Sequence, residues 1–332
     1  MLEFYVASVL SSEKNNYSTV QSAINAVPAD NSEPVLIHIA KGEYKEQLVI
    51  QKPFITLEGE SETETILTYD LGAYEILEDG IKRGTFRTAS VFIDTHDFTA
   101  RNLTFANTAG LGKLVGQALA LYVEGDRITF DHCQMLGSQD TLFTGPLPLT
   151  AYEPGGFRGP KEFAPRINGR QYYKNCFIRG DVDFIFGSAT AYFEQCEIFC
   201  QKTDDEPAAF TIEYQKTYSY ITAASTAEGQ EYGYVFDHCH LTGNCPKASC
   251  YLGRPWRNFA KVVYLHCEME EHIHPAGWHD WGKKAAHDTI FFAEYQSTGA
   301  GGDSKKRASF SKQLSEKEAH SFTKEKVLGN DF

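Results

Sequence analysis

Residues 128–136, ITFDHCQML, and residues 171–178, QYYKNCFI, share one pattern: alternating apolar residues, two mostly polar residues, a cysteine and further alternation. The pattern recurs in three later segments: AYFEQCEI (191–198), YVFDHCHL (234–241) and VVYLHCEM (262–269). An earlier segment, FTARNLTF (98–105), fits if Asn102 takes the place of the cysteine. Alternation of this kind is typical of short β-strands. The sequence therefore contains a repeated strand unit.

The distances between these units vary although the strand pattern is constant. From position 102 onward, the steps between the cysteine positions are 31, 43, 20, 43 and 28 residues. A propeller needs longer repeats with several strands each, and a leucine-rich array needs a ladder of leucines. A constant strand with loops of variable length instead indicates successive coils of a β-solenoid.

The repeated cysteines predict a column in the core. In a parallel β-helix, equivalent residues on successive coils lie about 4.8 Å apart, the ordinary spacing between strands. The column would contain Cys133, Cys176, Cys196, Cys239 and Cys267. A zinc site is disfavoured because the paired C-x₂-C spacing is absent. In GNCPKASCY, Cys245 and Cys250 form the only plausible local disulfide.

Both ends of the chain contain sequences suited to covering a solenoid. Ser18 and Gln21 are spaced as a capping box before a short helix that ends at Pro28. The tail SKQLSEKEAHSFTKEKVL (311–328) is polar and helix-prone, and we expect it to pack along or over the other end. The sequence has no linker, so we expect one domain, residues 1–332.

Composition excludes several classes of partner. The formal net charge of −13 disfavours nucleic acid and anionic membranes, and the basic run Lys305–Arg307 is too short to offset it. No segment is long enough to span a bilayer. Glu3 stands where a signal peptide would carry positive charge. We therefore expect a cytoplasmic protein (secreted if a native N-terminal segment is missing), and a monomer.

Two aspartates occupy equivalent places in two of the repeats. Asp140 follows Cys133 by seven residues, and Asp183 follows Cys176 by seven. If the cysteines stack, the backbones of the aspartates lie about one strand spacing apart. Carboxylates that close do not both ionise easily, which divides them into an acid and a base. One aspartate at a strand end is usually a turn residue, but two in matching phase favour a catalytic pair.

A close carboxylate pair supports two reactions. Retaining glycosidases hold two carboxyl groups about 5–5.5 Å apart. Acyl transfer uses one carboxylate as nucleophile and its partner as acid, and needs hydrogen-bond donors for the oxyanion. Gln139, next to Asp140, and Gln117, expected on the preceding strand, could supply such donors. The residues alone leave both reactions open, together with a non-catalytic carbohydrate-binding solenoid.

A set of motifs in fixed order resembles the pectin methylesterases, or pectinesterases, of carbohydrate esterase family eight. The motifs are GEYKE (42–46), GQALAL (116–121), GSQDTLF (137–143), DFIFG (183–187), LGRPW (252–256) and AGWHDW (276–281). This resemblance implies a right-handed, single-stranded parallel β-helix with a shallow cleft and no cofactor or metal. It also implies that the substrate is pectin or methylated oligogalacturonides.

The resemblance assigns roles to five residues. Asp183 would attack the methyl ester carbonyl of a galacturonate unit. Asp140 would protonate the departing methanol and then activate water. Gln117 and Gln139 would stabilise the oxyanion, and Arg254 would hold Asp183 ionised and oriented.

Further substrate contacts follow from the same resemblance. Trp256 would offer a face to a sugar ring. Phe143 and one of Trp278 or Trp281 could border the cleft, with core packing as the alternative. Ser90 falls where the family has a threonine that contacts substrate.

The chain departs from the family pattern between the two aspartates, where 43 residues replace a shorter coil. The extra sequence, at about 144–170, is rich in Pro, Gly and aromatic residues and is predicted to be a long loop. Our hypothesis is that the loop narrows the cleft and favours short or chain-end substrates. With the acidic composition, this suggests an intracellular enzyme that trims imported methylated oligogalacturonides.

A histidine cluster in EHIHPAGWHD (271–280) offers a possible metal site. Its members are His272, His274 and His279. Histidines on a surface loop are the commoner explanation, so we expect no metal.

Overall fold

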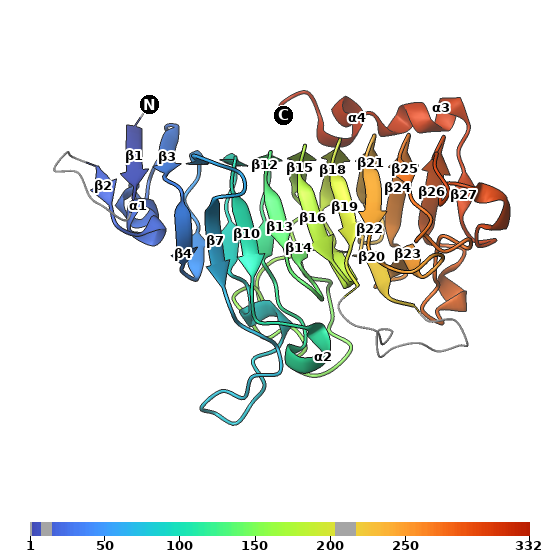
Figure 1. Ribbon diagram of the computed structural model, residues 1–332, viewed down its shortest axis with the longest axis horizontal. Helices are drawn as coiled ribbons and strands as arrows, with labels where there is room; N and C mark the ends of the chain where they lie inside the picture. Colours follow the sequence, from blue (N-terminus) through green and yellow to red (C-terminus); the bar gives the residue numbers. More distant parts are fainter. Residues whose placement is uncertain (1, 8–14, 203–216) are drawn as a thin grey trace.

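The computed structural model describes residues 2–7, 15–202 and 217–332. In these ranges three parallel sheets of 12, 8 and 7 strands run side by side along a solenoid (Figure 1). Neighbouring strands in each sheet come from successive coils, so the fold is the predicted right-handed parallel β-helix. No helix in the described ranges has the length and apolar character needed to cross a membrane.

Along most of the solenoid each coil contributes one strand to each sheet, and the order across the sheets is as follows. The 12-stranded sheet contains β2 (Asn16–Tyr17), β1 (Leu2–Val6), β3 (Val35–Ile39), β6 (Ile55–Gly59), β9 (Phe98–Arg101), β12 (Ile128–Asp131), β15 (Arg170–Lys174), β18 (Thr190–Glu194), β21 (Tyr234–Asp237), β24 (Lys261–Leu265), β26 (Phe291–Tyr295) and β27 (Lys312–Gln313). The 8-stranded sheet contains β25 (Glu268–Met269), β22 (His240–Gly243), β19 (Glu197–Cys200), β16 (Phe177–Gly180), β13 (Gln134–Leu136), β10 (Thr104–Asn107), β7 (Thr65–Tyr69) and β4 (Gly42–Lys45). The 7-stranded sheet contains β23 (Cys250–Pro255), β20 (Ser219–Ala224), β17 (Val182–Gly187), β14 (Leu142–Thr144), β11 (Leu121–Glu124), β8 (Val91–Asp94) and β5 (Leu48–Ile50). The helical segments are α1 (Val20–Ala26), η1 (Thr85–Arg87), α2 (Gly112–Val115), η2 (Lys284–Ala286), η3 (Ser304–Lys306), α3 (Glu316–Ala319), η4 (His320–Phe322) and α4 (Lys324–Leu328).

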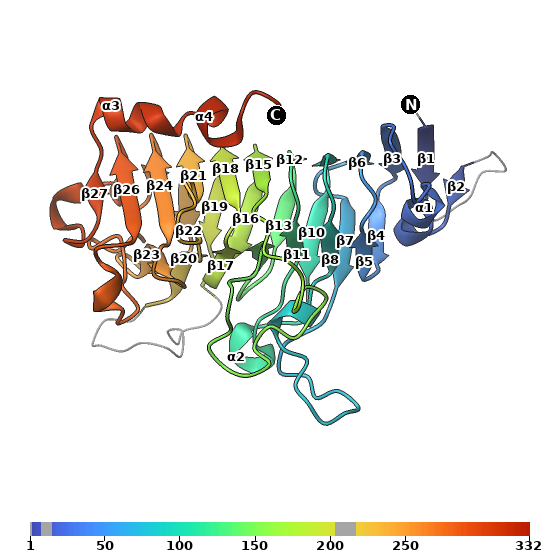
Figure 2. The ribbon, with the colours of Figure 1, turned by 180° about the vertical axis from the view of Figure 1, so that it is seen from behind.

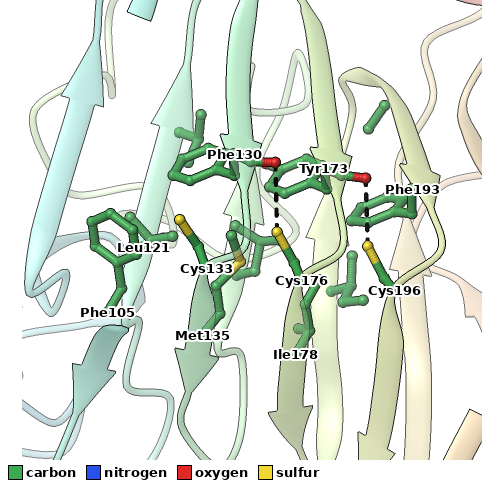
Figure 3. Close-up of a cluster of buried hydrophobic side chains, with 14 of the residues drawn as sticks. Phe105, Leu121, Phe130, Cys133, Met135, Tyr173, Cys176, Ile178, Phe193 and Cys196 are labelled. Atoms are coloured by element: carbon green, nitrogen blue, oxygen red, sulfur yellow. Dashed lines mark hydrogen bonds between the residues drawn. The ribbon is translucent and has the colours of Figure 1, made fainter. Parts of the chain in front are cut away.

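The predicted cysteine column lies in the core, and each of its members is at most 1% exposed. The Sγ atoms of Cys176 and Cys196 lie 3.6 and 3.4 Å from the carbonyl oxygens of Phe130 and Tyr173 (Figure 3). Beside the column, the rings of Phe130, Tyr173 and Phe193 stack with centroid distances of 5.1 and 4.6 Å. These stacks bury apolar surface on each coil and hold neighbouring coils in register.

The residue that continues the cysteine column in the segment 98–105 is Leu103, one position after the predicted Asn102. The pairing of β9 with β12 sets Phe98 opposite Ile128, which places Leu103, not Asn102, level with Cys133. Asn102 has φ of 56°, close to the 52° of the residue before Cys133. Asparagine and histidine tolerate this left-handed conformation, so Asn102 belongs to the turn and its fully buried neighbour Leu103 to the core.

Cys245 and Cys250, the only plausible pair for a local disulfide, are not cross-linked, and all eight cysteines are free thiols. The Sγ atom of Cys245 lies 3.4 Å from the carbonyl oxygen of Cys200 instead. The chain relies on stacked coils in this region and not on a cross-link.

Helix α1 covers the N-terminal end as predicted, but its cap differs from the expected Ser18–Gln21 box. Thr19 is the N-cap and accepts a hydrogen bond from the Ser22 amide. The carboxylate of Glu46, in the motif GEYKE, accepts bonds from the amides of Val20 and Gln21 at 2.8 and 3.0 Å. A distant carboxylate therefore satisfies the free N–H groups, which makes this part of the motif structural.

The C-terminal tail packs along the solenoid and does not close its end. Helix α4 contacts β15 and β18, and the chain terminus lies beside these strands (Figures 1 and 2). Val327 and Leu328 are buried against the outer face of the 12-stranded sheet. Arg170 anchors the tail through bonds of 2.6 Å to the Leu328 carbonyl and the Asp331 carboxylate.

The long loop between the aspartates is present, and it occupies residues 145–169 between β14 and β15. We call this segment the insertion. It gathers with residues 70–90 and α2 on one side of the solenoid (Figure 2). These segments surround the outward-facing surface of the 7-stranded sheet, where the candidate site lies.

Candidate active site

A cavity of about 350 Å³ opens over the 7-stranded sheet. It is lined by Thr85, Phe86, Gln117, Gln139, Asp140, Ala151, Tyr152, Glu153, Gly156, Phe157, Asp183, Phe186, Ala223, Arg254, Trp256, Arg257 and Trp281. Seven residues that the sequence predicted for the site therefore meet around one cavity: both aspartates, both glutamines, Arg254, Trp256 and Trp281.

The strand register makes Asp140 and Asp183 neighbours. In the pairing of β14 with β17, Leu142 lies opposite Ile185, an offset of 43 residues that also relates Asp140 to Asp183. The Asp140 amide donates to the Val182 carbonyl at 3.0 Å. The predicted pairing is therefore present, with the two backbones about one strand spacing apart.

Both aspartates have unusual backbone conformations. Asp140 has φ of 63° and Asp183 has φ of 53°, in the left-handed region. The register between β17 and β20 also shifts between Val182 and Ile185, which places Asp183 in a bulge. Bulges and left-handed residues redirect a side chain away from the regular alternation. Here they direct the carboxylate of Asp183 into the cavity.

Arg254 forms a bidentate pair with Asp183 through two hydrogen bonds. Its Nε and Nη2 atoms donate to the two carboxylate oxygens at 2.8 and 2.7 Å. Its guanidinium carbon lies 3.9 Å from the ring centroid of Tyr220 and 3.7 Å from that of Trp281. A buried planar cation held between two rings is a rigid partner for a carboxylate anion. Arg254 thus fixes the orientation of the Asp183 side chain.

The surroundings of Asp140 favour the protonated form of its carboxyl group. Burial raises the pKa of its carboxyl group well above the ordinary value of 3.8, and the charges of Asp183 and Asp181 add to this effect, while Arg254 opposes it. A carboxyl group of this kind keeps its proton at pH values where an exposed aspartate is ionised. The cavity therefore holds a carboxylic acid beside a guanidinium-bound carboxylate.

The two glutamines approach from adjacent backbone segments. Gln139 precedes Asp140, and its carbonyl oxygen accepts a bond of 3.1 Å from the Ala118 amide. Gln117 lies between α2 and β11, not on a strand as expected. Their side-chain amides can donate hydrogen bonds into a cavity that also contains both aspartates.

Three of the expected substrate contacts do not line the cavity. Ser90 is fully buried, and its amide bonds to the Leu119 carbonyl. Trp278 is a core residue whose ring stacks on Phe292 at 4.5 Å. Phe143 is fully buried beneath the floor, level with Phe186 in the register of β14 and β17. Of these two paired phenylalanines, Phe186 lines the cavity and Phe143 does not.

The structure adds residues that the sequence did not indicate. Thr85 and Phe86 come from η1, and the Phe86 ring packs edge-on against that of Phe157 at 5.7 Å. Arg257, which also lines the cavity, follows Trp256 directly in the sequence. The position of Arg257 directly after the motif LGRPW could have indicated it as a site residue. Thr85 and Phe86 lie in a segment with no repeat pattern, so the sequence did not indicate them.

The insertion forms one wall of the cavity. The Tyr152 hydroxyl donates to the Trp256 carbonyl at 2.8 Å, and Arg257 Nη2 donates to the Thr150 carbonyl at 2.8 Å. The guanidinium of Arg257 lies 3.8 Å from the Tyr152 ring centroid. The insertion is therefore pinned to the chain that follows β23.

The histidines of residues 271–280 do not converge on a metal position. His272 is buried, contrary to the expected surface loop. The ring of His274 stacks on Tyr251 at 4.6 Å, and the Nδ1 atom of His279 accepts a bond from the Trp281 amide. Within the described residues, none of the three belongs to a group of converging metal-ligand atoms.

Known proteins share both the sequence and the fold of this chain. The chain matches the family model described as Pectinesterase over residues 6–146 and 166–331. It is 36% identical over 314 residues to Pectinesterase 31 of Arabidopsis thaliana, covering 92% of this chain and 87% of that protein. The gap between the matched ranges, 147–165, lies within the insertion.

Solved structures agree with the sequence match. The structure is similar to carrot pectin methylesterase with a TM-score of 0.80 and 29% identity, covering 99% of this chain and 94% of that chain. It is similar to pectin methylesterase PemA of Erwinia chrysanthemi with a TM-score of 0.78 and 28% identity, covering 99% and 98%. A third similar structure, with a TM-score of 0.80, 28% identity and coverage of 99% and 98%, is a pectin methylesterase in complex with a hexasaccharide.

Proposed function

This chain belongs to the pectinesterase family and hydrolyses the methyl esters of pectin, and from that premise we propose that Asp183 is its nucleophile and Asp140 its general acid and base. One observation carries the proposal: a carboxylate held by the two bonds of Arg254 lies beside a buried carboxyl group whose pKa is raised. The two groups thus differ in the way that nucleophile and acid must differ.

The reaction would proceed in two steps. An oxygen of Asp183 attacks the ester carbonyl carbon, and the tetrahedral intermediate collapses to an acyl-enzyme anhydride as the methoxy group leaves. Asp140 donates its proton to that oxygen, which releases methanol. Asp140, now ionised, takes a proton from water, and the resulting hydroxide attacks the anhydride. The products are a galacturonic acid unit, which ionises and releases a proton to solvent, and the free Asp183 carboxylate, with Asp140 protonated again.

The other polar residues support these steps. The amides of Gln117 and Gln139 would donate hydrogen bonds to the oxyanion of the tetrahedral intermediate. Arg254 is a positioning residue, since it acts through Asp183.

The cavity also suits a polyanionic substrate. Arg254 and Arg257 line it, and the Nζ atom of Lys283 lies 4.6 Å from the Trp281 ring centroid. Burial lowers the pKa of Lys283 to about 8. In a protein with a net charge of −13, Arg257 and Lys283 would offer cations at this cavity to the carboxylates of neighbouring galacturonate units. Trp256 and Trp281 offer aromatic faces to sugar rings.

Release of methanol without chain cleavage tests this function. We expect the purified protein to release methanol from methylated pectin, lower the pH and create no new reducing ends. A galacturonan hydrolase using the same aspartates would create reducing ends without methanol, and a carbohydrate-binding solenoid would do neither. Either result would refute the esterase assignment.

The insertion supports a finer proposal about chain length. Because it walls the cavity and is bonded to Trp256 and Arg257, we propose that it favours short methylated oligogalacturonides or chain ends over internal sites of the polymer. A wall beside the reacting centre limits how a long chain can continue past it.

Replacing Tyr152 with alanine tests this preference. Tyr152 is 61% exposed, so the variant should fold, and we expect the ratio of kcat/KM on polymer to that on a short oligomer to rise by about tenfold, roughly 1.4 kcal/mol. Phe163→Ala is the matched control, because Phe163 lies in the same insertion, is 93% exposed and does not line the cavity. The proposal is wrong if the polymer-to-oligomer ratio of kcat/KM is unchanged both in Tyr152→Ala and in a chain lacking residues 147–165.

A further inference from the structure

Two histidines stack on successive coils, away from the cavity described above. His238 and His266 each precede a cysteine of the column and have φ of 52° and 51°. This left-handed conformation turns their side chains outward from the core. Their rings lie 4.7 Å apart and are tilted by 26°. The solenoid repeat thus places one imidazole directly above another, at the turn between the 12-stranded and 8-stranded sheets.

A carboxylate joins the two imidazoles. The Oδ1 atom of Asp237 lies 2.8 Å from Nδ1 of His238 and 3.0 Å from Nδ1 of His266. Two ligand atoms bound to one tetrahedral zinc ion, each about 2.0–2.2 Å from it, are themselves about 3.3–3.6 Å apart. One ligand atom from each of the three side chains lies within 4.8 Å of those of the other two, so rotation of the side chains can bring all three around one metal ion.

The surroundings favour a cation. Asp237 and His266 line a cavity of about 520 Å³ between the outer strands and the C-terminal helices. Three glutamates line the same cavity: Glu194, Glu316 and Glu325. The second oxygen of Asp237 accepts a bond of 3.0 Å from the Tyr192 hydroxyl, which fixes the orientation of the carboxylate. The open cavity leaves room for water to complete the coordination.

A second Asp-His-Cys turn in the same chain can be compared with this group. Asp131 and His132 form the same Asp-His-Cys turn, with a bond of 2.7 Å between carboxylate and imidazole. The equivalent positions on the coils before and after it carry Asn102 and Asn175, so no second imidazole is present. Among the described residues, the group with converging ligand atoms is that of Asp237, His238 and His266.

We propose that Asp237, His238 and His266 form a binding site for a divalent transition-metal cation of the zinc class. Two imidazoles and one carboxylate suit Zn²⁺, Ni²⁺, Cu²⁺ or Co²⁺, whereas Mg²⁺ and Ca²⁺ prefer sites built from oxygen ligands. The site is separate from the residues of the ester-hydrolysing cavity, so the metal has no part in the hydrolysis.

Titration of the full chain, free of any histidine tag and stripped with a chelator, tests the site. We expect Zn²⁺ to bind with a stoichiometry of one by calorimetry, and Co²⁺ to produce visible absorption bands. His238→Ala and His266→Ala should each weaken binding by at least about 10- to 100-fold, the loss that follows removal of a group that only orients a ligand. Both side chains are partly exposed, at 59% and 35%, so the variants should fold.

His132→Ala is the matched control, and it should bind Zn²⁺ as the unaltered protein does. Methanol release should be the same in the stripped and the zinc-loaded protein. The proposal is overturned if Zn²⁺ does not bind, if His132→Ala weakens binding as much as His266→Ala, or if Mg²⁺ binds as tightly as Zn²⁺.

Discussion

Asp183→Asn should lower kcat for methanol release by at least about 10⁴-fold, because a neutral amide cannot attack the ester carbonyl. Both carboxylate oxygens of Asp183 are bonded to Arg254, and asparagine preserves the shape of this side chain but not its charge. The measurement is single-turnover and steady-state methanol release from methylated oligogalacturonides.

Two controls for Asp183→Asn are its thermal stability and its binding of oligogalacturonides. Arg254 is 3% exposed, and removing its anion leaves a buried charge unpaired, at a cost of roughly 3–5 kcal/mol of stability. Turnover must therefore be measured below the unfolding transition. Oligogalacturonide binding, followed by the fluorescence of Trp256 and Trp281, should persist. Near-normal turnover by a folded Asp183→Asn protein would refute the nucleophile assignment.

Asp140→Asn should lower kcat by about 10²- to 10⁴-fold, because methoxide is a poor leaving group and an amide cannot protonate it. In the unaltered enzyme the first step needs protonated Asp140, so kcat should fall as the pH rises through the raised pKa of this residue. The remaining activity of the variant should lack that alkaline fall. A variant with the same pH profile as the unaltered enzyme would exclude Asp140 as the acid.

The same substitution should stabilise the protein at high pH. The pKa of Asp140 in the folded protein lies above the ordinary value of 3.8, so its contribution to stability is fully present below that value and is lost as the pH rises through the folded pKa. Asparagine does not ionise and avoids this loss. Thermal unfolding at about pH 4 and about pH 8 should show a melting-temperature advantage for Asp140→Asn that grows with pH. An advantage that is independent of pH would contradict the raised pKa.

The pairing of the two aspartates could be predicted from the sequence because parallel coils impose one register. Residues at the same distance from stacked core residues reach the same level, provided that neither strand contains an extra residue before them. The seven residues after Cys133 and Cys176 meet this condition, and β14 pairs with β17 at the expected offset of 43. The bulge that could have broken the rule lies between β17 and β20 instead.

Two local predictions were wrong by one residue, for different reasons. The carboxylate of Glu46 caps α1, so the helix did not need the Ser18–Gln21 box. The repeat pattern placed Asn102 at the cysteine position, but Asn102 occupies the left-handed turn beside Leu103. In both cases the helix or strand was predicted correctly, and the predicted position of the cap or of the core residue was shifted by one residue.

By itself, the sequence determined the repeated coils, the buried cysteines and the phase that joins Asp140 to Asp183, since periodicity is a property of the chain. The resemblance to a family added the choice of an ester bond and the role of Arg254. Only the tertiary structure decided which outward residues meet the cavity. Trp281 lines it and Trp278 lies in the core, because alternation specifies a side of the strand but not which loop covers that side. The same reason applies to the insertion, whose bonds to Trp256 and Arg257 join residues about a hundred positions apart.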